Sequence, residues 1–159
     1  MRIVSPFVEA RRALHFRDFK YPCRPLGSYE TLVLLEVVAT GRAAATELTA
    51  GGAGESRRQE LRQRVERGAR AKNSLAMAYL WNADRWARHW LVRARATGCD
   101  VDDLTQEAFL GLLRAIDTFD PHGRRGFDHY AEVLMYGRIA HTVRRSLARD
   151  ARPAAERDD

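Results

Sequence analysis

Cysteine is scarce in this chain of 159 residues, which contains only Cys23 and Cys99. The two lie far apart, in neither a metal-binding nor a redox spacing, and this argues against a disulfide framework and against a zinc site. We therefore expect two reduced thiols and neither a bound metal nor a cofactor.

Long hydrophobic runs are absent as well. No apolar stretch approaches the roughly 20 residues that a membrane-spanning helix needs. At the N-terminus, Ser5, Pro6 and Glu9 interrupt the apolar core that a secretory signal requires. The sequence predicts a cytoplasmic protein with no membrane partner, and its length suits one domain.

Catalytic patterns are also missing. The five histidines are scattered, no nucleophile is paired with a base, and no Walker-type phosphate loop occurs. Asp102 and Asp103 stand at an expected helix start, where capping accounts for acidic residues. We therefore expect that the protein is not an enzyme.

Positive charge is carried almost entirely by arginine, because Lys20 and Lys72 are the only lysines in a chain of net charge +6. An excess of positive charge favours a polyanionic partner, since neutralised phosphates release counterions. An arginine- and alanine-rich composition is also typical of a GC-rich genome. The charge alone therefore does not identify a nucleic-acid partner.

The chain does contain helical periodicity, and it shows no alternation of the kind that predicts strands. The fold class that we expect is all-α. Ser28 is expected to cap a helix that ends at Gly41, and Gly68 to mark a bend or break in a long helix. The helices are predicted at 6–18, 29–41, 42–48, 55–96, 103–118 and 127–148, with an acidic capping box at Asp100 and Asp103.

The most informative stretch is residues 103–131. It contains Asp103-Leu-Thr-Gln-Glu107, then Gly111-Leu, Phe119-Asp-Pro, and finally Phe127-Asp-His-Tyr-Ala131. This order resembles domain 2 of bacterial sigma-70-type initiation factors, which read Asp-Leu-Ile-Gln-Glu-Gly, Gly-Leu, Phe-Asp-Pro and Phe-Ser-Thr-Tyr-Ala. The resemblance covers residues 70–150 well and 26–69 in outline. It implies a sigma-70 domain 2-like helical bundle.

The helix from Asp103 has two faces. Its core face is expected to hold Leu104, Ala108, Leu112, Ala115 and Ile116. A neighbouring row mixes carboxylates, an amide and exposed apolar side chains, which suits a protein interface. In the family this helix docks on the coiled coil of the beta-prime subunit of core RNA polymerase. The resemblance implies that this docking row comprises Asp103, Gln106, Glu107, Leu110 and Leu113, with Phe109 added because the family usually has Asn there.

The resemblance also implies contact with promoter DNA, through the nontemplate single strand of a -10-like element. Such contact needs aromatic platforms for unstacked bases and positive charge along the phosphates. Tyr130 corresponds to the tyrosine that replaces an extruded adenine in the stack, although a tyrosine there can equally fill the core. The expected DNA-binding residues are Arg114, Phe119, Arg124, Arg125, Phe127, Tyr130, Val133, Leu134, Gly137, Arg138, His141, Arg144 and Arg145.

The chain departs from the family pattern on this DNA surface. Val133 and Leu134 occupy the places of a tryptophan pair, and Gly137 replaces a base-reading Gln. Glu132 adds a negative charge that is expected to face DNA. The usual wedge and the usual sequence preference are therefore both open questions.

We expect residues 28–150 to form the domain, residues 1–27 an N-terminal extension and residues 151–159 a disordered tail. The sequence suggests a stand-alone domain 2, that is, a minimal or split sigma factor, with a separate protein supplying -35 recognition. Two alternatives remain open. One is a non-initiating regulator that occupies the sigma site on polymerase, and the other is a helical DNA-binding module that acts without polymerase.

Overall fold

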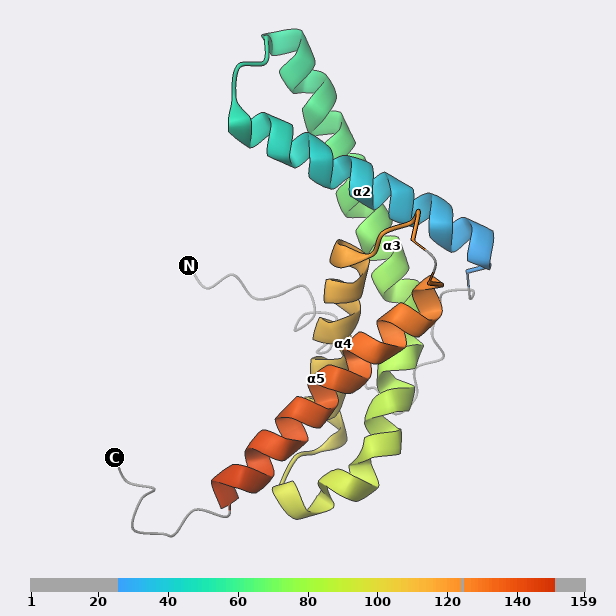
Figure 1. Ribbon diagram of the computed structural model, residues 1–159, viewed down its shortest axis with the longest axis vertical. Coiled ribbons are helices and arrows are strands. Elements are labelled where there is room, and N and C mark those ends of the chain that lie inside the picture. Colours follow the sequence, from blue (N-terminus) through green and yellow to red (C-terminus); the bar gives the residue numbers. More distant parts are fainter. Residues whose placement is uncertain (1–25, 124, 151–159) are drawn as a thin grey trace, which may run out of the picture.

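The computed structural model describes residues 26–123 and 125–150, and these residues are all-α, as predicted. Within them lie four α-helices and one short 3-10 helix, and no strand (Figure 1). The elements are α2 (Ser28–Ala50), α3 (Glu55–Ala94), η1 (Arg95–Thr97), α4 (Val101–Thr118) and α5 (Phe127–Asp150). The predicted helix at 6–18 and the predicted disordered tail at 151–159 lie outside the described residues.

Helix α2 and the first half of α3 form an antiparallel arm that extends beyond the rest of the bundle (Figure 1). The two helices cross at Gly41 and Gly68, where a Cβ placed on Gly41 would lie only 2.8 Å from the Gly68 Cα. Glycine is needed here because any side chain would push the two backbones apart. Near the tip, Arg57 of α3 pairs with Glu47 of α2 at 2.9 Å.

The structure corrects three predictions about α2 and α3. Helix α2 runs unbroken through Gly41, so the predicted helices at 29–41 and 42–48 are one helix. Gly68 lies inside the continuous α3 and does not end it. Ser28 is the first residue of α2 and not its cap; Gly27 precedes the helix, and its amide donates to the Glu30 carboxylate at 2.9 Å. Gly41 and Gly68 instead allow close packing of α2 against α3. The sequence did not predict this role, because glycine also commonly ends helices.

Helix α4 begins with the predicted capping box. The Asp100 carboxylate accepts from the Asp103 amide at 2.8 Å, and the Asp103 carboxylate accepts from the Asp100 amide at 3.2 Å. Reciprocal bonds of this kind satisfy backbone donors that the first helical turn leaves unpaired. The predicted core face of α4 is confirmed, because Leu104, Ala108, Leu112, Ala115 and Ile116 are all buried.

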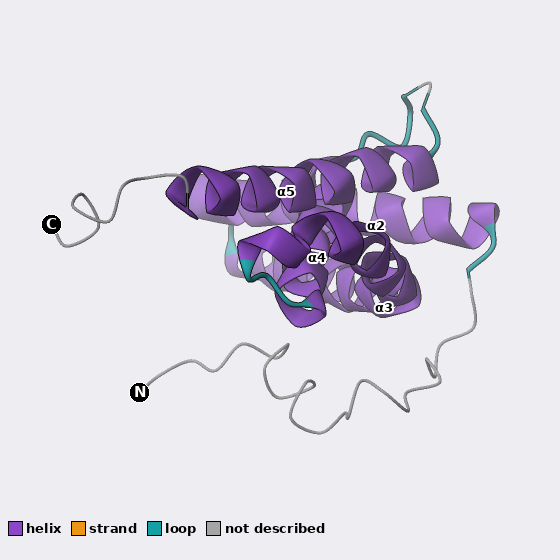
Figure 2. Ribbon diagram, turned by 90° about the horizontal axis from the view of Figure 1, so that it is seen from below, coloured by secondary structure: helices purple, strands orange, loops and turns teal. Residues whose placement is uncertain are grey.

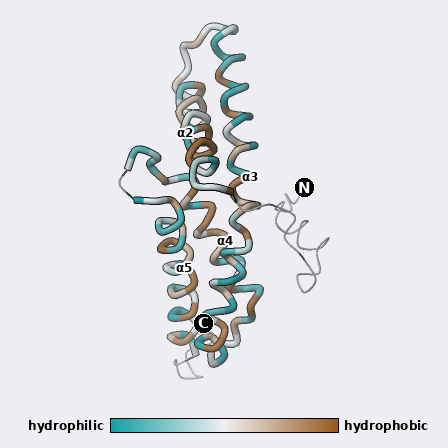
Figure 3. The backbone as a smooth tube through the Cα atoms, turned by 90° about the vertical axis from the view of Figure 1, so that its right-hand side faces the viewer, coloured by the Kyte–Doolittle hydropathy of each residue, from teal (hydrophilic) through white to brown (hydrophobic). Residues whose placement is uncertain are grey.

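Helix α4 packs against both α3 and α5, so the second half of α3 and the last two helices form the body of the bundle (Figure 2). Gly111 brings α4 close to α5, since a Cβ there would lie 2.7 Å from the Leu134 carbonyl oxygen. Apolar residues gather where these helices meet, whereas the part of α3 within the arm is largely hydrophilic (Figure 3). None of the described helices is both long and apolar enough to cross a membrane.

Candidate nucleic-acid and protein interface

The docking row lies along one side of α4. Asp103, Gln106 and Leu110 are exposed, and Glu107, Phe109 and Leu113 are half-buried. The Asp103 carboxylate also accepts the capping bond from the Asp100 amide, so it keeps one oxygen near the start of its own helix. The row thus combines accessible acidic and amide groups with partly exposed apolar side chains, a mixture suited to a specific protein contact.

One ion pair connects the docking row to α5. A carboxylate oxygen of Glu107 lies 2.8 Å from a terminal nitrogen of the Arg138 guanidinium. The Nε atom of Arg138 is buried and has no hydrogen-bond partner. A residue predicted to bind polymerase is therefore paired with one predicted to bind DNA.

The predicted aromatic residues form one connected group at the junction of α4 and α5. The Phe119 ring lies edge-on to the Phe127 ring at 5.3 Å and tilted against Tyr130 at 5.7 Å. Phe119 and Phe127 are only 6% and 4% exposed, whereas Tyr130 is half-buried. Tyr130 also shares a hydrogen bond with the Thr118 hydroxyl at 2.9 Å. Phe119 thus contacts Tyr130, and Phe127 in turn contacts Phe119; the predicted contact of these phenylalanines with DNA stays a prediction.

The outer face of α5 carries most of the other predicted DNA contacts. Val133, Gly137, His141, Arg144 and Arg145 are exposed along it. Leu134 is half-buried, and its carbonyl faces the close approach to Gly111. Arg114 on α4 and Arg125 before α5 are also exposed. Arg124 lies outside the described residues.

A hollow of about 280 Å³ opens between the start of α2, α3 and the start of α5, and no sequence pattern predicted it. Asn82 lines it and is only 7% exposed, yet its Oδ1 atom has no hydrogen-bond partner. A buried amide oxygen without a partner is costly, and it can accept from a ligand donor. We call this the Asn82 hollow; its walls also include Leu26, Ser28, Ala78, Tyr79, Trp81, Arg85, Asp128 and Glu132.

Tyr79 joins three helices beside the Asn82 hollow. Its hydroxyl donates to the Asp128 carboxylate on α5 at 2.7 Å and lies 3.2 Å from the Thr31 hydroxyl on α2. Burial raises the pKa of Tyr79, and the Asp128 carboxylate raises it further. The buried hydroxyl therefore stays protonated and holds α2 against the body of the bundle.

A second hollow, of about 240 Å³, lies further along the groove between α3 and α5. We call it the Trp86 hollow; its lining residues are Trp86, His129, Glu132, Val133 and Tyr136. The Arg85–Glu132 ion pair, 3.1 Å long, involves residues of both hollows. Glu132, which we expected to face DNA as a negative charge, is paired with Arg85.

Two comparisons with known proteins bear on this site. A family model described as sigma-70 region 2 matches residues 80–150. The match covers the end of α3, η1, α4 and α5, which carry the docking row, Tyr130 and the Trp86 hollow. No curated protein matches the chain.

Proposed function

We propose that this protein is a sigma-like transcription initiation factor, because a sigma-70 region 2 family model matches residues 80–150. It binds core RNA polymerase and engages the nontemplate strand of a -10-like promoter element. The observation that carries the proposal is that α4 and α5, packed together at Gly111, place the docking row beside the aromatic and arginine residues of α5. The functional unit would be residues 28–150.

The docking row supports the polymerase half of this proposal. Two of its exposed members, Gln106 and Leu110, lie beside the partly exposed Glu107, and α4 itself is fixed by a fully buried opposite face. A rigid helix with this mixed surface suits a helical partner such as the coiled coil of the beta-prime subunit. Binding energy would concentrate on the few side chains that become fully covered.

The rings and cations around α5 support the DNA half. Tyr130 offers a partly exposed ring in contact with the buried Phe119, and Arg144 and Arg145 offer charge for phosphates. The Asn82 hollow adds a recess, lined by residues that include Trp81 and Asn82, in which an unpaired base could lodge. Capture of extruded bases in recesses of this kind stabilises an opened duplex.

Reconstitution tests the proposal directly. The full chain would be added to cognate core polymerase with genomic fragments, and RNA 5′ ends would be mapped. We expect starts that are absent with core polymerase alone and that share a motif about ten base pairs upstream. Failure of the chain to bind core polymerase at low salt would contradict the proposal.

A second candidate function is a non-initiating regulator that occupies the sigma site on polymerase. The observation that favours it is the outer face of α5, where the exposed Val133 and Gly137 offer neither a stacking ring nor a base-reading amide. Stable binding to core polymerase together with no mapped starts on any fragment would favour this function over initiation.

A further inference from the structure

Aromatic rings from two helices meet at the Trp86 hollow. The Trp86 ring of α3 lies 6.0 Å from the Tyr136 ring of α5, nearly perpendicular to it, and Tyr136 in turn lies 5.1 Å from Trp90. Val133 and Tyr136 on the α5 side are 50% and 42% exposed. Trp90 is buried in the core, whereas the half-buried Trp86 and the exposed Tyr136 and Val133 line a recess that opens to solvent.

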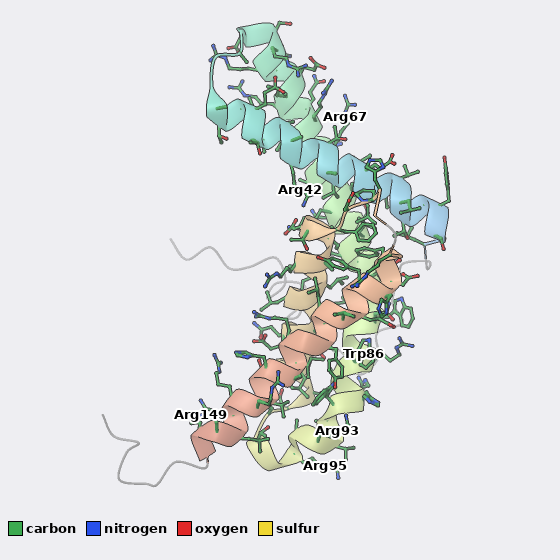
Figure 4. All side chains as sticks on the ribbon, viewed as in Figure 1. Arg42, Arg67, Trp86, Arg93, Arg95 and Arg149 are labelled. Atoms are coloured by element: carbon green, nitrogen blue, oxygen red, sulfur yellow. The ribbon has the colours of Figure 1, made fainter. Side chains whose placement is uncertain are left out.

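Positive charge surrounds these rings. The Arg85 guanidinium lies 5.3 Å from the centre of Trp81, in the Asn82 hollow, and 6.0 Å from the centre of Trp86. Further along α3, the Arg93 guanidinium lies 5.4 Å from the centre of Trp90, on the same side of the bundle as Trp86 (Figure 4). The one carboxylate in the lining, that of Glu132, is paired with Arg85.

Exposed aromatic rings flanked by guanidinium groups suit a nucleic-acid base, because any base can stack on a ring and its phosphates favour nearby cations. An apolar segment of a protein would gain from the rings, but it would leave the Arg93 guanidinium without a complementary charge. Gly137 keeps the adjacent turn of α5 open, since a Cβ built there meets nothing within 4 Å.

We propose that the Trp86 hollow is a second stacking site for an unpaired DNA base, with Trp86 as its platform and the perpendicular Tyr136 ring as its side wall. This inference rests on the proposed function, in which the nontemplate strand crosses α5. Because Arg85 contacts one indole in each hollow, a single strand lying in the groove between α3 and α5 would pass from the Asn82 hollow to the Trp86 hollow across this one cation.

The test uses holoenzyme assembled from core polymerase and the full chain, and forked DNA with a single-stranded nontemplate arm. The fluorescent base 2-aminopurine is placed at one position of the arm at a time. Trp86→Phe keeps a ring, whereas Trp86→Leu keeps apolar packing but removes the ring. Val92→Ala is the matched control, because Val92 is an exposed apolar residue of α3 that lines neither hollow.

We expect one 2-aminopurine position, distinct from the one beside Tyr130, to be quenched by stacking in the wild type, in Trp86→Phe and in Val92→Ala. In Trp86→Leu the quenching at that position should be lost, and affinity for forked DNA should fall about tenfold, the scale of one stacked base. Tyr136→Leu removes the side wall and should weaken the quenching at the same position. It keeps the proposal falsifiable if circular dichroism shows that Trp86→Leu does not fold.

The inference would be overturned if Trp86→Leu showed the quenching and the affinity of the wild type. If that variant does not fold, the same result in Tyr136→Leu would overturn it. Either outcome would leave the proposed function intact. Weaker assembly of a folded Trp86→Leu variant with core polymerase in the absence of DNA would also overturn it, since the hollow would then be a protein contact. If wild-type holoenzyme does not bind forked DNA at all, the proposed function fails and this inference fails with it.

Discussion

The Glu107 carboxylate on α4 and the Arg138 guanidinium on α5 lie 2.8 Å apart, and the pair bridges the two surfaces that the proposed function uses. Both side chains are partly exposed, so the pair contributes at most about 1 kcal/mol to folding stability. A weak pair of this kind can exchange partners. If a polymerase residue bound the Glu107 carboxylate, the Arg138 guanidinium would become available to a phosphate.

Replacing Gln106 and Glu107 together with alanine should weaken association with core polymerase by about tenfold or more, because it removes polar groups from the centre of the docking row. Association can be measured by competition against a labelled sigma factor. Arg138→Ala is the matched control, since it breaks the same ion pair from the other side and should leave polymerase affinity unchanged. An equal loss in both variants would contradict the assignment of Glu107 to the docking row.

Replacing Tyr130 with alanine should reduce promoter opening while leaving polymerase association nearly unchanged. The ring is the outermost of the group formed with Phe119 and Phe127, and a stacked base is worth about 1–3 kcal/mol. Tyr130→Phe keeps the ring and loses only the bond to the Thr118 hydroxyl, so it should remain close to the wild type. Permanganate reactivity of unpaired thymines measures the opening. Loss of polymerase binding in Tyr130→Ala would indicate instead that the ring supports the fold.

Gly41→Ala should destabilise the protein by about 1–3 kcal/mol, because its Cβ would collide with the Gly68 backbone and force α2 away from α3. Gly137→Ala is the matched control within α5. Its Cβ meets open space, so alanine should stabilise the helix by up to about 1 kcal/mol. Thermal unfolding followed by circular dichroism measures both changes. Similar melting temperatures for the two variants would show that the crossing at Gly41 is not close.

Tyr79→Phe should cost about 1 kcal/mol near neutral pH, since it leaves the Asp128 and Thr31 groups without their shared partner. The folded pKa of Tyr79 is raised, so its contribution is complete below the unfolded value of about 10 and declines as pH rises above it. The difference in unfolding free energy between the wild type and Tyr79→Phe should therefore shrink above pH 10. Urea unfolding at several pH values measures it, and a difference that grows with pH would contradict this assignment.

The sequence predicted the helices of the bundle body well because their signals are local. The capping box at Asp100 and Asp103 marks the start of α4, and the spacing of Leu104, Ala108 and Leu112 marks its buried face. Gly41 and Gly68 were misread because a glycine that permits a close crossing is identical in sequence to one that ends a helix. The two readings differ only in what lies opposite the glycine, which the sequence does not show.

The two hollows were missed for the same reason. Trp81, Arg85 and Trp86 belong to α3, whereas Asp128, Glu132 and Tyr136 lie more than forty residues later on α5. Nothing in either segment alone predicts that they face each other. Burial could not be predicted for Phe119 and Phe127 either, because an aromatic residue beside a loop suits a core and a DNA surface equally well.

Helix α3 carries the Gly68 crossing about a third of the way along and lines both hollows further on, with no break between them. At 1.5 Å per residue this helix is about 60 Å long. The tip of the arm and the indoles of Trp81 and Trp86 therefore belong to one continuous helix. A partner that binds the far end of the arm and displaces it would also displace the α3 side of the groove in which a DNA strand would lie.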